Sequence, residues 1–256
     1  MRIVVLAKEV PDTWSNRKLN LETGLLDRQA SDPVADEINE RALENALRYR
    51  DAGGEAEITV LTMGPEQAEA SVRKLLAMGA DTAVIVADTG LAGADMKRTA
   101  EVLAAAITKI GADLVLAGDA ATDGRGGLVP PMVAELLGWP VLPALETLQI
   151  QAAGAEGTVP VDGETIAVRS TFPLVAAITE KTAEARFPNF KGIMRAKKKP
   201  LTVWSLSDLD VASQGPAQSV MVSAVERPAK TAGPKIEDDG TAAEQLAEFL
   251  QSNRLL

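Results

Sequence analysis

The sequence predicts an α/β fold with a parallel, doubly wound sheet and helices on both faces. Two observations support this from residue 1 to about residue 140. Short apolar runs without alternation are typical of buried parallel strands, and amphipathic repeats at helical spacing lie between them. The connections are only a few residues long, which favours right-handed β-α-β crossovers.

The elements are expected in a regular order. Strands are predicted over Arg2–Ala7, Glu57–Met63, Ala83–Ala87 and Leu114–Ala117. Helices are predicted from Asp36 to Gly53-Gly54, over Glu66–Met78, over Asp95–Ile110, and after Pro130-Pro131. Glycine at a helix end accepts the left-handed conformation that stops the helix, and proline is tolerated in a first helical turn. The weak alternation over Leu19–Leu26 predicts a small hairpin. Lys8–Trp14 is expected as a loop in which Pro11 prevents the first strand from continuing.

The second part of the chain changes character. Short strand-like runs separated by glycine and proline predict an antiparallel extension at Leu145–Ile150, Gly157–Val161, Thr165–Ser170 and Leu174–Ile178. Leu201–Leu206 is expected as a last strand. We expect a core over 1–207 and a C-terminal extension over 208–256 that ends in a helix, Thr241–Ser252. Such an extension is expected to pack on a partner subunit.

Composition restricts the function. The formal net charge of -10 argues against a nucleic-acid partner. No apolar run reaches the ~18 residues of a membrane span, and the first residues fit a strand better than a signal peptide, so a cytoplasmic protein is expected. The chain has no cysteine and no histidine. Thiolate chemistry, the usual hydrolase triads and sulfur-ligated clusters are therefore excluded, whereas metal sites with oxygen ligands and carboxylate catalysis remain possible. Our interpretation is nevertheless that the chain has no catalytic side chains and no metal site. A cofactor would have to supply any catalysis.

The turn after the strand at Leu114–Ala117 is the candidate ligand site. Three glycines, Gly124, Gly126 and Gly127, precede the helix that Pro130 opens. Free N–H groups at a helix start favour an anion, and ligands of open α/β sheets bind at the carboxyl ends of strands. The turn lacks the Lys-Ser/Thr ending of a P-loop and the GxGxxG spacing. A phosphate site and a plain tight turn both fit the pattern.

Two further segments carry exposed-looking aromatic residues. Trp14 lies in the polar loop after the first strand, where it is either a lid or stacking surface or, as we favour, a partly buried packing residue. Arg186–Lys199, RFPNFKGIMRAKKK, is a basic segment.

Five segments together resemble the β subunits of electron transfer flavoproteins, the FixA-like group. They are Ile3–Trp14, Glu40–Arg48, Val60–Asp81, Leu114–Asp123 and Arg186–Lys199. The joint occurrence of RKLLAMGAD and FKGIMRAKKK at this spacing is highly specific, and the resemblance covers essentially the whole chain.

The resemblance implies an electron carrier and not an enzyme. It implies a heterodimer in which the α subunit holds most of one redox FAD and the β subunit braces it. The pair would take electrons from acyl-CoA or other flavoprotein dehydrogenases and pass them to a membrane quinone oxidoreductase. The β subunit would hold AMP or, in an electron-bifurcating variant, a second FAD. The alternative from another class is a stand-alone nucleotide-binding α/β protein.

The resemblance also implies site residues. The nucleotide site would comprise Leu6, Asp36, Glu37, Ile38, Asn39, Met63, Gly118, Asp123, Gly124, Arg125, Gly126, Gly127, Leu128 and Val129. The chain departs from the family at Leu128-Val129-Pro130, where a Gln-Thr/Val-Gly run is usual, and at Asp36-Glu37-Ile38, where Asn-Pro-Tyr/Phe is common. Backbone contacts are therefore expected to dominate. Asp123 could cap the turn or bind ribose, and we favour capping.

The remaining implied residues concern the flavin and the partners. Thr13 and Trp14 would lie near FAD. Phe190 would be the apolar anchor that docks a dehydrogenase, with Lys191 and Arg195 beside it. Phe187 and Ile193 are expected in the core. Arg186, Arg195 and Lys197–Lys199 would steer acidic partners or hold the segment.

Overall fold

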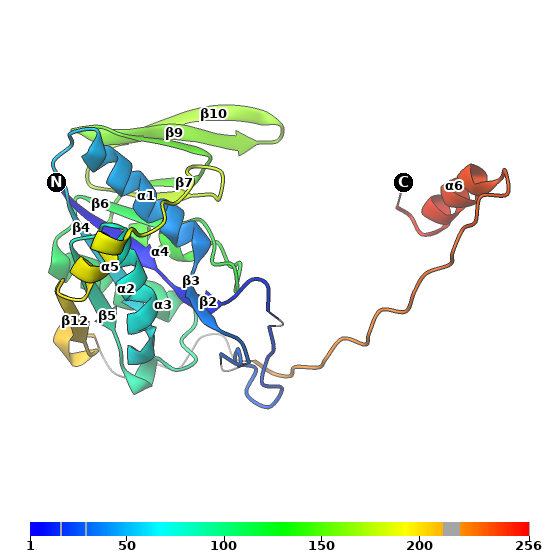
Figure 1. Cartoon of the computed structure of the whole chain (residues 1–256), viewed down its shortest axis with the longest axis horizontal. Helices are drawn as coiled ribbons and strands as arrows, with labels where there is room; N and C mark the ends of the chain where they lie inside the picture. The colour runs from blue at the N-terminus through cyan, green and yellow to red at the C-terminus, as the bar shows by residue number, and fades with distance from the viewer. Residues whose placement is uncertain (16, 29, 212–220, 256) are drawn as a thin grey trace.

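The central feature of the molecule is a seven-stranded sheet in which every neighbouring pair is parallel (Figure 1). The computed structural model describes residues 1–15, 17–28, 30–211 and 221–255. The strand order is β12-β5-β4-β1-β6-β11-β7. The strands are β1 (Arg2–Ala7), β4 (Glu57–Met63), β5 (Thr82–Val86), β6 (Leu114–Gly118), β7 (Val141–Leu145), β11 (Leu174–Ile178) and β12 (Leu201–Trp204).

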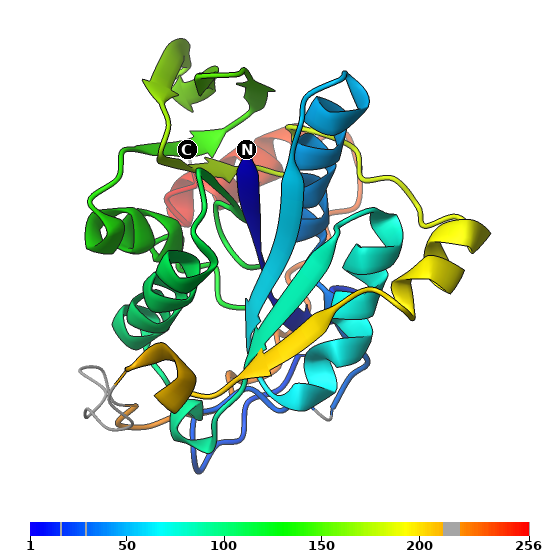
Figure 2. The same ribbon diagram turned by 90° about the vertical axis from the view of Figure 1, so that its left-hand side faces the viewer.

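Helices cover both faces of this sheet, as the sequence predicts. Figure 2 shows α1 (Glu37–Asp51), α2 (Glu69–Met78) and α5 (Phe190–Ala196) on one side and α3 (Met96–Ile110) and α4 (Val129–Leu137) on the other. Two separate apolar clusters form between the sheet and these helix layers. The core is built mainly from Ala, Val, Leu and Ile, because the chain has few aromatic residues. The doubly wound architecture is therefore confirmed.

Local capping explains where the helices begin and end. Asp36 and Asp95 are the N-caps of α1 and α3, and their carboxylates accept hydrogen bonds from the amides of Ile38 and Arg98. These bonds satisfy amides that have no partner inside the helix. Gly111 ends α3 in the left-handed conformation. Residues Glu66–Ala68, predicted as the start of a longer helix, form a short 3₁₀ turn, η1, before α2.

Smaller sheets lie beside the main one. β2 (Glu9–Pro11) pairs with β3 (Pro33–Ala35) in an antiparallel ribbon. The expectation that Lys8–Trp14 is entirely a loop is wrong, because Glu9–Pro11 form β2. The strand ends at Pro11, which has no N–H to continue the pairing. Between these strands, an antiparallel bridge between Leu19 and Leu26 confirms the predicted hairpin.

The predicted antiparallel extension is correct only in part. β8 (Thr147–Ile150), β9 (Gly154–Val161) and β10 (Glu164–Thr171) form a three-stranded antiparallel sheet. Leu174–Ile178, predicted as part of it, is instead β11, a parallel strand between β6 and β7. All five of its residues are buried, so it needs cover on both faces, which only the central sheet provides.

The C-terminal segment leaves the body. After β12 and the short η3 (Ser207–Leu209), residues 221–255 run away from the sheet to α6 (Ala242–Ser252) (Figure 1). None of the residues of α6 is buried. Among the described residues, none of the helices combines the length and the apolar character that a bilayer span needs.

Candidate functional site

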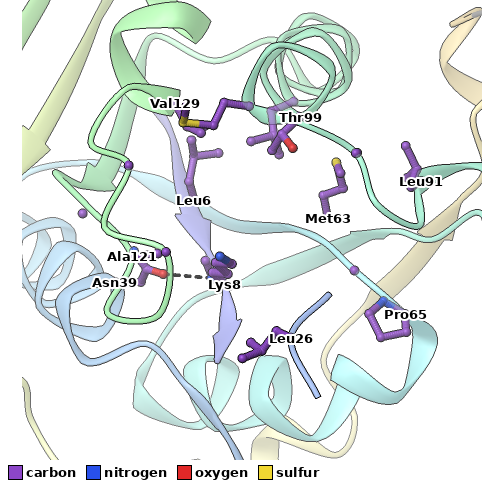
Figure 3. A pocket seen from close by; sticks show the side chains of 18 of the residues that line it. Leu6, Lys8, Leu26, Asn39, Met63, Pro65, Leu91, Thr99, Ala121 and Val129 are labelled. Carbon is purple, nitrogen blue, oxygen red and sulfur yellow. Dashed lines mark hydrogen bonds between the residues drawn. The ribbon is translucent and has the colours of Figure 1, made fainter. Parts of the chain in front are cut away.

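A cavity of about 940 Å³ opens at the carboxyl ends of β1, β4, β5 and β6 (Figure 3). Leu6, Met63, Ala87 and Gly118 line it at or just beyond the ends of these strands. The turns that follow the strands complete the wall, namely the β4–α2 turn, the β5–α3 loop and the glycine-rich β6–α4 turn. This is the edge of a parallel sheet at which ligands of α/β proteins bind.

A buried carboxylate holds the glycine-rich turn in place. Asp36 is fully buried, and besides capping α1 it accepts hydrogen bonds from the amide of Thr122 at 2.7 Å and from its hydroxyl at 2.9 Å. A charged acceptor makes stronger hydrogen bonds than a neutral one. The start of α1 and the β6–α4 turn are thereby joined through one side chain.

Asp123 is engaged inside the same turn. Its carboxylate accepts from the amide of Gly124 at 2.6 Å and from the Lys8 ammonium at 2.7 Å, and its side chain is only 5% exposed. The carboxylate therefore points into the turn and not into the cavity. Lys8, which directly follows β1, also donates its amide to Asn39 Oδ1 at 2.8 Å.

Two glycines in this region permit close approach. A methyl group at Gly118 would lie 2.9 Å from Asn39 Nδ2, and one at Gly126 would lie 2.7 Å from Met96 Sδ. Gly127 has a φ of +65°, a conformation that L side chains rarely adopt. The amides of Gly126 and Gly127 donate to no acceptor within the part of the chain that the structure describes. Both residues line the cavity just before α4, so their amides are available to a ligand.

The structure brings many of the expected nucleotide-site residues together. Those that line the cavity are Leu6, Asn39, Met63, Gly118, Gly124, Gly126, Gly127 and Val129. Asp36, Ile38 and Asp123 lie behind its wall. Glu37, Arg125 and Leu128 are exposed and are not part of the lining.

Several lining residues were missed by sequence reasoning. Charged groups on the wall include Lys8, Arg28, Glu66, Asp88 and Asp119. Three of these residues lie at strand ends: Lys8 directly follows β1, Asp119 directly follows β6, and Asp88 lies two residues after β5. The rule that ligands bind at the carboxyl ends of parallel strands could have found them. Arg28 lies in the hairpin, which carries no such signal.

The Asp119 carboxyl has a perturbed acidity. Burial at the cavity wall raises its pKa above the usual value, with a smaller contribution in the same direction from Glu180. The hydrogen bond from the Ala120 amide acts the other way. The ionised form of Asp119 is therefore less favourable at this position than that of an aspartate in water.

Thr13 and Trp14 of the first loop are not part of the cavity lining. Thr13 and Trp14 are exposed, and Trp14 is 96% accessible in this chain. The expectation that Trp14 packs as a partly buried residue is wrong, because its side chain is almost fully exposed in a turn that its amide closes on Asp12 Oδ1. Tryptophan is highly buried on average, so an indole with this degree of exposure is uncommon.

The basic segment Arg186–Lys199 contains a short helix, α5, which the sequence pattern did not predict. Asn189 caps α5 by accepting from the Gly192 amide at 2.8 Å. The helix packs on α2 through Gly192 and Ala196, and a methyl group at Gly192 would meet the Ala77 carbonyl at 2.3 Å. This geometry turns Phe190 outward, and its side chain is 77% exposed.

The expectation that Phe187 and Ile193 belong to the core is therefore wrong. Phe187 is 91% exposed and Ile193 is 46% exposed. The buried residue of α5 is the small Ala196, and at Gly192 the close contact with α2 leaves no room for a larger side chain.

The cations of this segment form two groups: some bond to other parts of the protein body and the others are exposed to solvent. Arg186 makes a bidentate pair with the buried Glu44, at 2.7 and 2.9 Å, and a second contact with Asp51, and these bonds raise the pKa of its guanidinium. Lys199 donates to the carbonyls of Leu76 and Ala80, and burial lowers the pKa of its ammonium. The exposed cations are Lys191, Arg195, Lys197 and Lys198.

Among the described residues, no three or more Asp or Glu side chains are grouped so that they could share a metal ion.

The fold and the site define an α/β protein with a ligand-sized cavity at the carboxyl edge of a parallel sheet. A family model described as "Electron transfer flavoprotein domain" matches residues 23–209. The "Electron transfer flavoprotein subunit beta" of Mycobacterium tuberculosis is 44% identical, with 99% of each chain covered. The protein of the same name from Bacillus subtilis is 34% identical over 98% of this chain and 96% of its own.

A third relative carries a different name. The "Caffeyl-CoA reductase-Etf complex subunit CarD" of Acetobacterium woodii is 33% identical over 98% of this chain and 97% of its own. The chain belongs to the β-subunit family of electron transfer flavoproteins.

We predict that Asp36→Ala destabilises the fold by about 2–4 kcal/mol, because it removes a helix cap and leaves the Thr122 amide and hydroxyl unpaired in a buried position. Chemical denaturation measures the change. Glu37→Ala, one residue later and exposed, is the matched control and is expected to change stability by no more than about 0.5 kcal/mol. Equal effects of the two substitutions would contradict the role of Asp36.

We predict that Asp119→Asn stabilises the protein more at about pH 7.5 than at about pH 4. A raised native-state pKa means that the ionised carboxylate costs stability once the pH exceeds that pKa, and this cost disappears as the pH falls through it. Asparagine keeps an oxygen that can accept from the Ala120 amide. Thermal unfolding at the two pH values measures the effect, and a gain independent of pH would contradict the assignment.

Proposed function

We propose that the chain is the β subunit of a heterodimeric electron carrier that braces an FAD held mainly by the α subunit and buries AMP in the cavity at the strand ends. The carrier takes electrons from flavoprotein dehydrogenases of the acyl-CoA type and passes them to a quinone oxidoreductase. The observation that carries this proposal is the cavity beside the glycine-rich turn, in a chain of this family.

The residues present fit a mononucleotide. The two unpaired amides at Gly126 and Gly127 precede α4, so they are placed to bind a phosphate at the start of a helix. Apolar side chains, including Leu6 and Met63, line the other part of the wall and suit a nucleobase. The volume of about 940 Å³ lies near the upper end of the range for small-molecule sites, roughly 300–1,000 Å³.

The chain contributes position and shielding to the flavin, and the FAD supplies the electron chemistry when bound. The chain itself has no cysteine or histidine that could exchange electrons or protons at neutral pH. The exposed Trp14 and its neighbour Thr13 are the surface that we assign to the flavin. An exposed indole offers a flat apolar face, which a ring system can cover.

The exposed side of α5 is the surface that we assign to dehydrogenases. Phe190 projects from it as an apolar anchor, with Lys191 and Arg195 on the same short helix. An aromatic anchor surrounded by charged residues is typical of a hot spot in a transient interface. Arg186 and Lys199 bond to other parts of the protein and hold the segment on the body. Their charged groups are already engaged, so we do not assign them to the partner contact.

Cofactor analysis of the coexpressed and purified two-subunit complex tests the proposal. We expect one FAD and one AMP per complex, as measured by the visible spectrum and by chromatography of the released nucleotides. Two FAD molecules and no AMP would indicate the electron-bifurcating variant. A colourless complex, or a chain that forms no complex with an α subunit, would contradict the proposed function.

We predict that Phe190→Ala slows electron transfer from a cognate dehydrogenase by roughly tenfold or more without loss of FAD, since a hot-spot truncation of about 1.4 kcal/mol corresponds to a factor of ten. Stopped-flow reduction of the complex measures the rate. Leu136→Ala, an exposed apolar residue of α4 on the other side of the sheet, is the matched control. Equal rates for the two variants would remove Phe190 from the interface.

A further inference from the structure

We propose that the hairpin 17–28 is the outer wall of the nucleotide cavity and that it limits the rate at which the nucleotide leaves. The proposal rests on the proposed nucleotide site and extends it to a segment that the expected site residues do not include. The evidence is the position of the hairpin over the cavity, its close approach to the opposite rim, and the bonds that hold it there.

The hairpin supplies part of the cavity lining although it lies far from the strand ends in the sequence. Leu25, Leu26 and Arg28 line the cavity, and the hairpin lies between β2 and β3. Figure 3 shows Leu26 on the same side of the cavity as Lys8. Two leucine side chains therefore face the space that the strand ends and the glycine-rich turn enclose from the other directions.

The hairpin also reaches the opposite rim. A methyl group added at Gly93, in the β5–α3 loop, would lie 3.9 Å from Leu25 Cδ2. A side chain at this position would touch Leu25, so Leu25 lies close to the β5–α3 loop although Gly93 itself has no side chain to meet it. Because residues of both segments line the cavity, their close approach narrows this side of it.

Arginine side chains hold the hairpin at both ends. Arg17 donates to the carbonyl of Thr122, in the glycine-rich turn, and Arg28 donates to the carbonyl of Glu9 at 3.0 Å. At the tip, Gly24 has a φ of +67°, and a methyl group there would lie 2.5 Å from Met221 Cγ. The tip is therefore in contact with the beginning of the described C-terminal segment.

The hairpin has its own internal order. The amide of Asn20 donates to the Leu25 carbonyl at 2.9 Å, and the amide of Asp27 donates to the Lys18 carbonyl at 2.9 Å. These bonds hold the two arms of the hairpin together as one unit. Release of a nucleotide from the cavity then requires that Leu25 leave the β5–α3 loop, or that the ligand pass the two leucines.

Leu25 and Leu26 are the residues that test this inference. Leu25 is 47% exposed in the chain without ligand, so its substitution leaves the folded core intact. Leu21 is 50% exposed on the same hairpin but is not part of the cavity lining, which makes Leu21→Ser a matched control. Serine removes the apolar contact in each case and keeps the backbone conformation accessible.

The first measurement is nucleotide release from the coexpressed two-subunit complex, loaded with a fluorescent adenosine monophosphate and chased with unlabelled AMP. We expect Leu25→Ser and Leu26→Ser each to speed release by about tenfold, a loss of apolar contact equivalent to about 1.4 kcal/mol, while Leu21→Ser releases at the unmodified rate. Should Leu26→Ser fail to fold, Leu25→Ser alone decides. Release at the unmodified rate from Leu25→Ser would overturn the proposal.

The second measurement needs no nucleotide. Hydrogen exchange of the amides in the turn 119–128 is expected to be faster in Leu25→Ser than in the unmodified complex, and unchanged in Leu21→Ser. If the complex contains no nucleotide and this difference is still seen, the proposed nucleotide fails while the hairpin remains the cavity wall. If nucleotide binds and neither release nor exchange changes, the nucleotide site stands and the hairpin is excluded from it.

Discussion

The site depends on one buried carboxylate. Asp36 caps α1 and also holds Thr122, in a turn that lies 86 residues further along the chain. A buried charge is tolerable only when hydrogen bonds replace its lost hydration, and here three donors do so. Asp36 therefore fixes the glycine-rich turn against the start of α1. The Thr122 donors in the turn, in return, satisfy the carboxylate that caps the helix.

Sequence patterns predicted those parts of the molecule that local chemistry determines. The alternation of apolar runs and amphipathic helices was sufficient for the parallel sheet, and the strand-end rule located the cavity. β11 was assigned to the wrong sheet, because a short apolar run contains no information about its neighbours. The exposure of Ile193 follows from the tight packing of Gly192, in the same helix, on α2, which is a contact between distant segments. Phe187 precedes that helix and is also exposed.

The cavity wall was likewise predicted only in part, because some of its residues reach it through contacts between distant segments. Lys8 and Asp119 follow strands and could have been found, whereas Leu25 and Leu26 reach the cavity only because the hairpin folds back over it. The basic segment divides in a comparable way. Its sequence shows a run of similar cations, but Arg186 and Lys199 are bonded internally while Lys191 and Arg195 face solvent. Only tertiary structure separates a cation that holds a segment from one that meets a partner.

The long C-terminal segment has a consequence for the cell. Val222 and Val225 are almost fully exposed, and α6 buries none of its residues on the body of this chain. Chaperones and proteases act on proteins that display apolar surface of this kind. The expected packing of this segment on a companion subunit would cover that surface, and a copy synthesised in excess of that subunit would carry it uncovered.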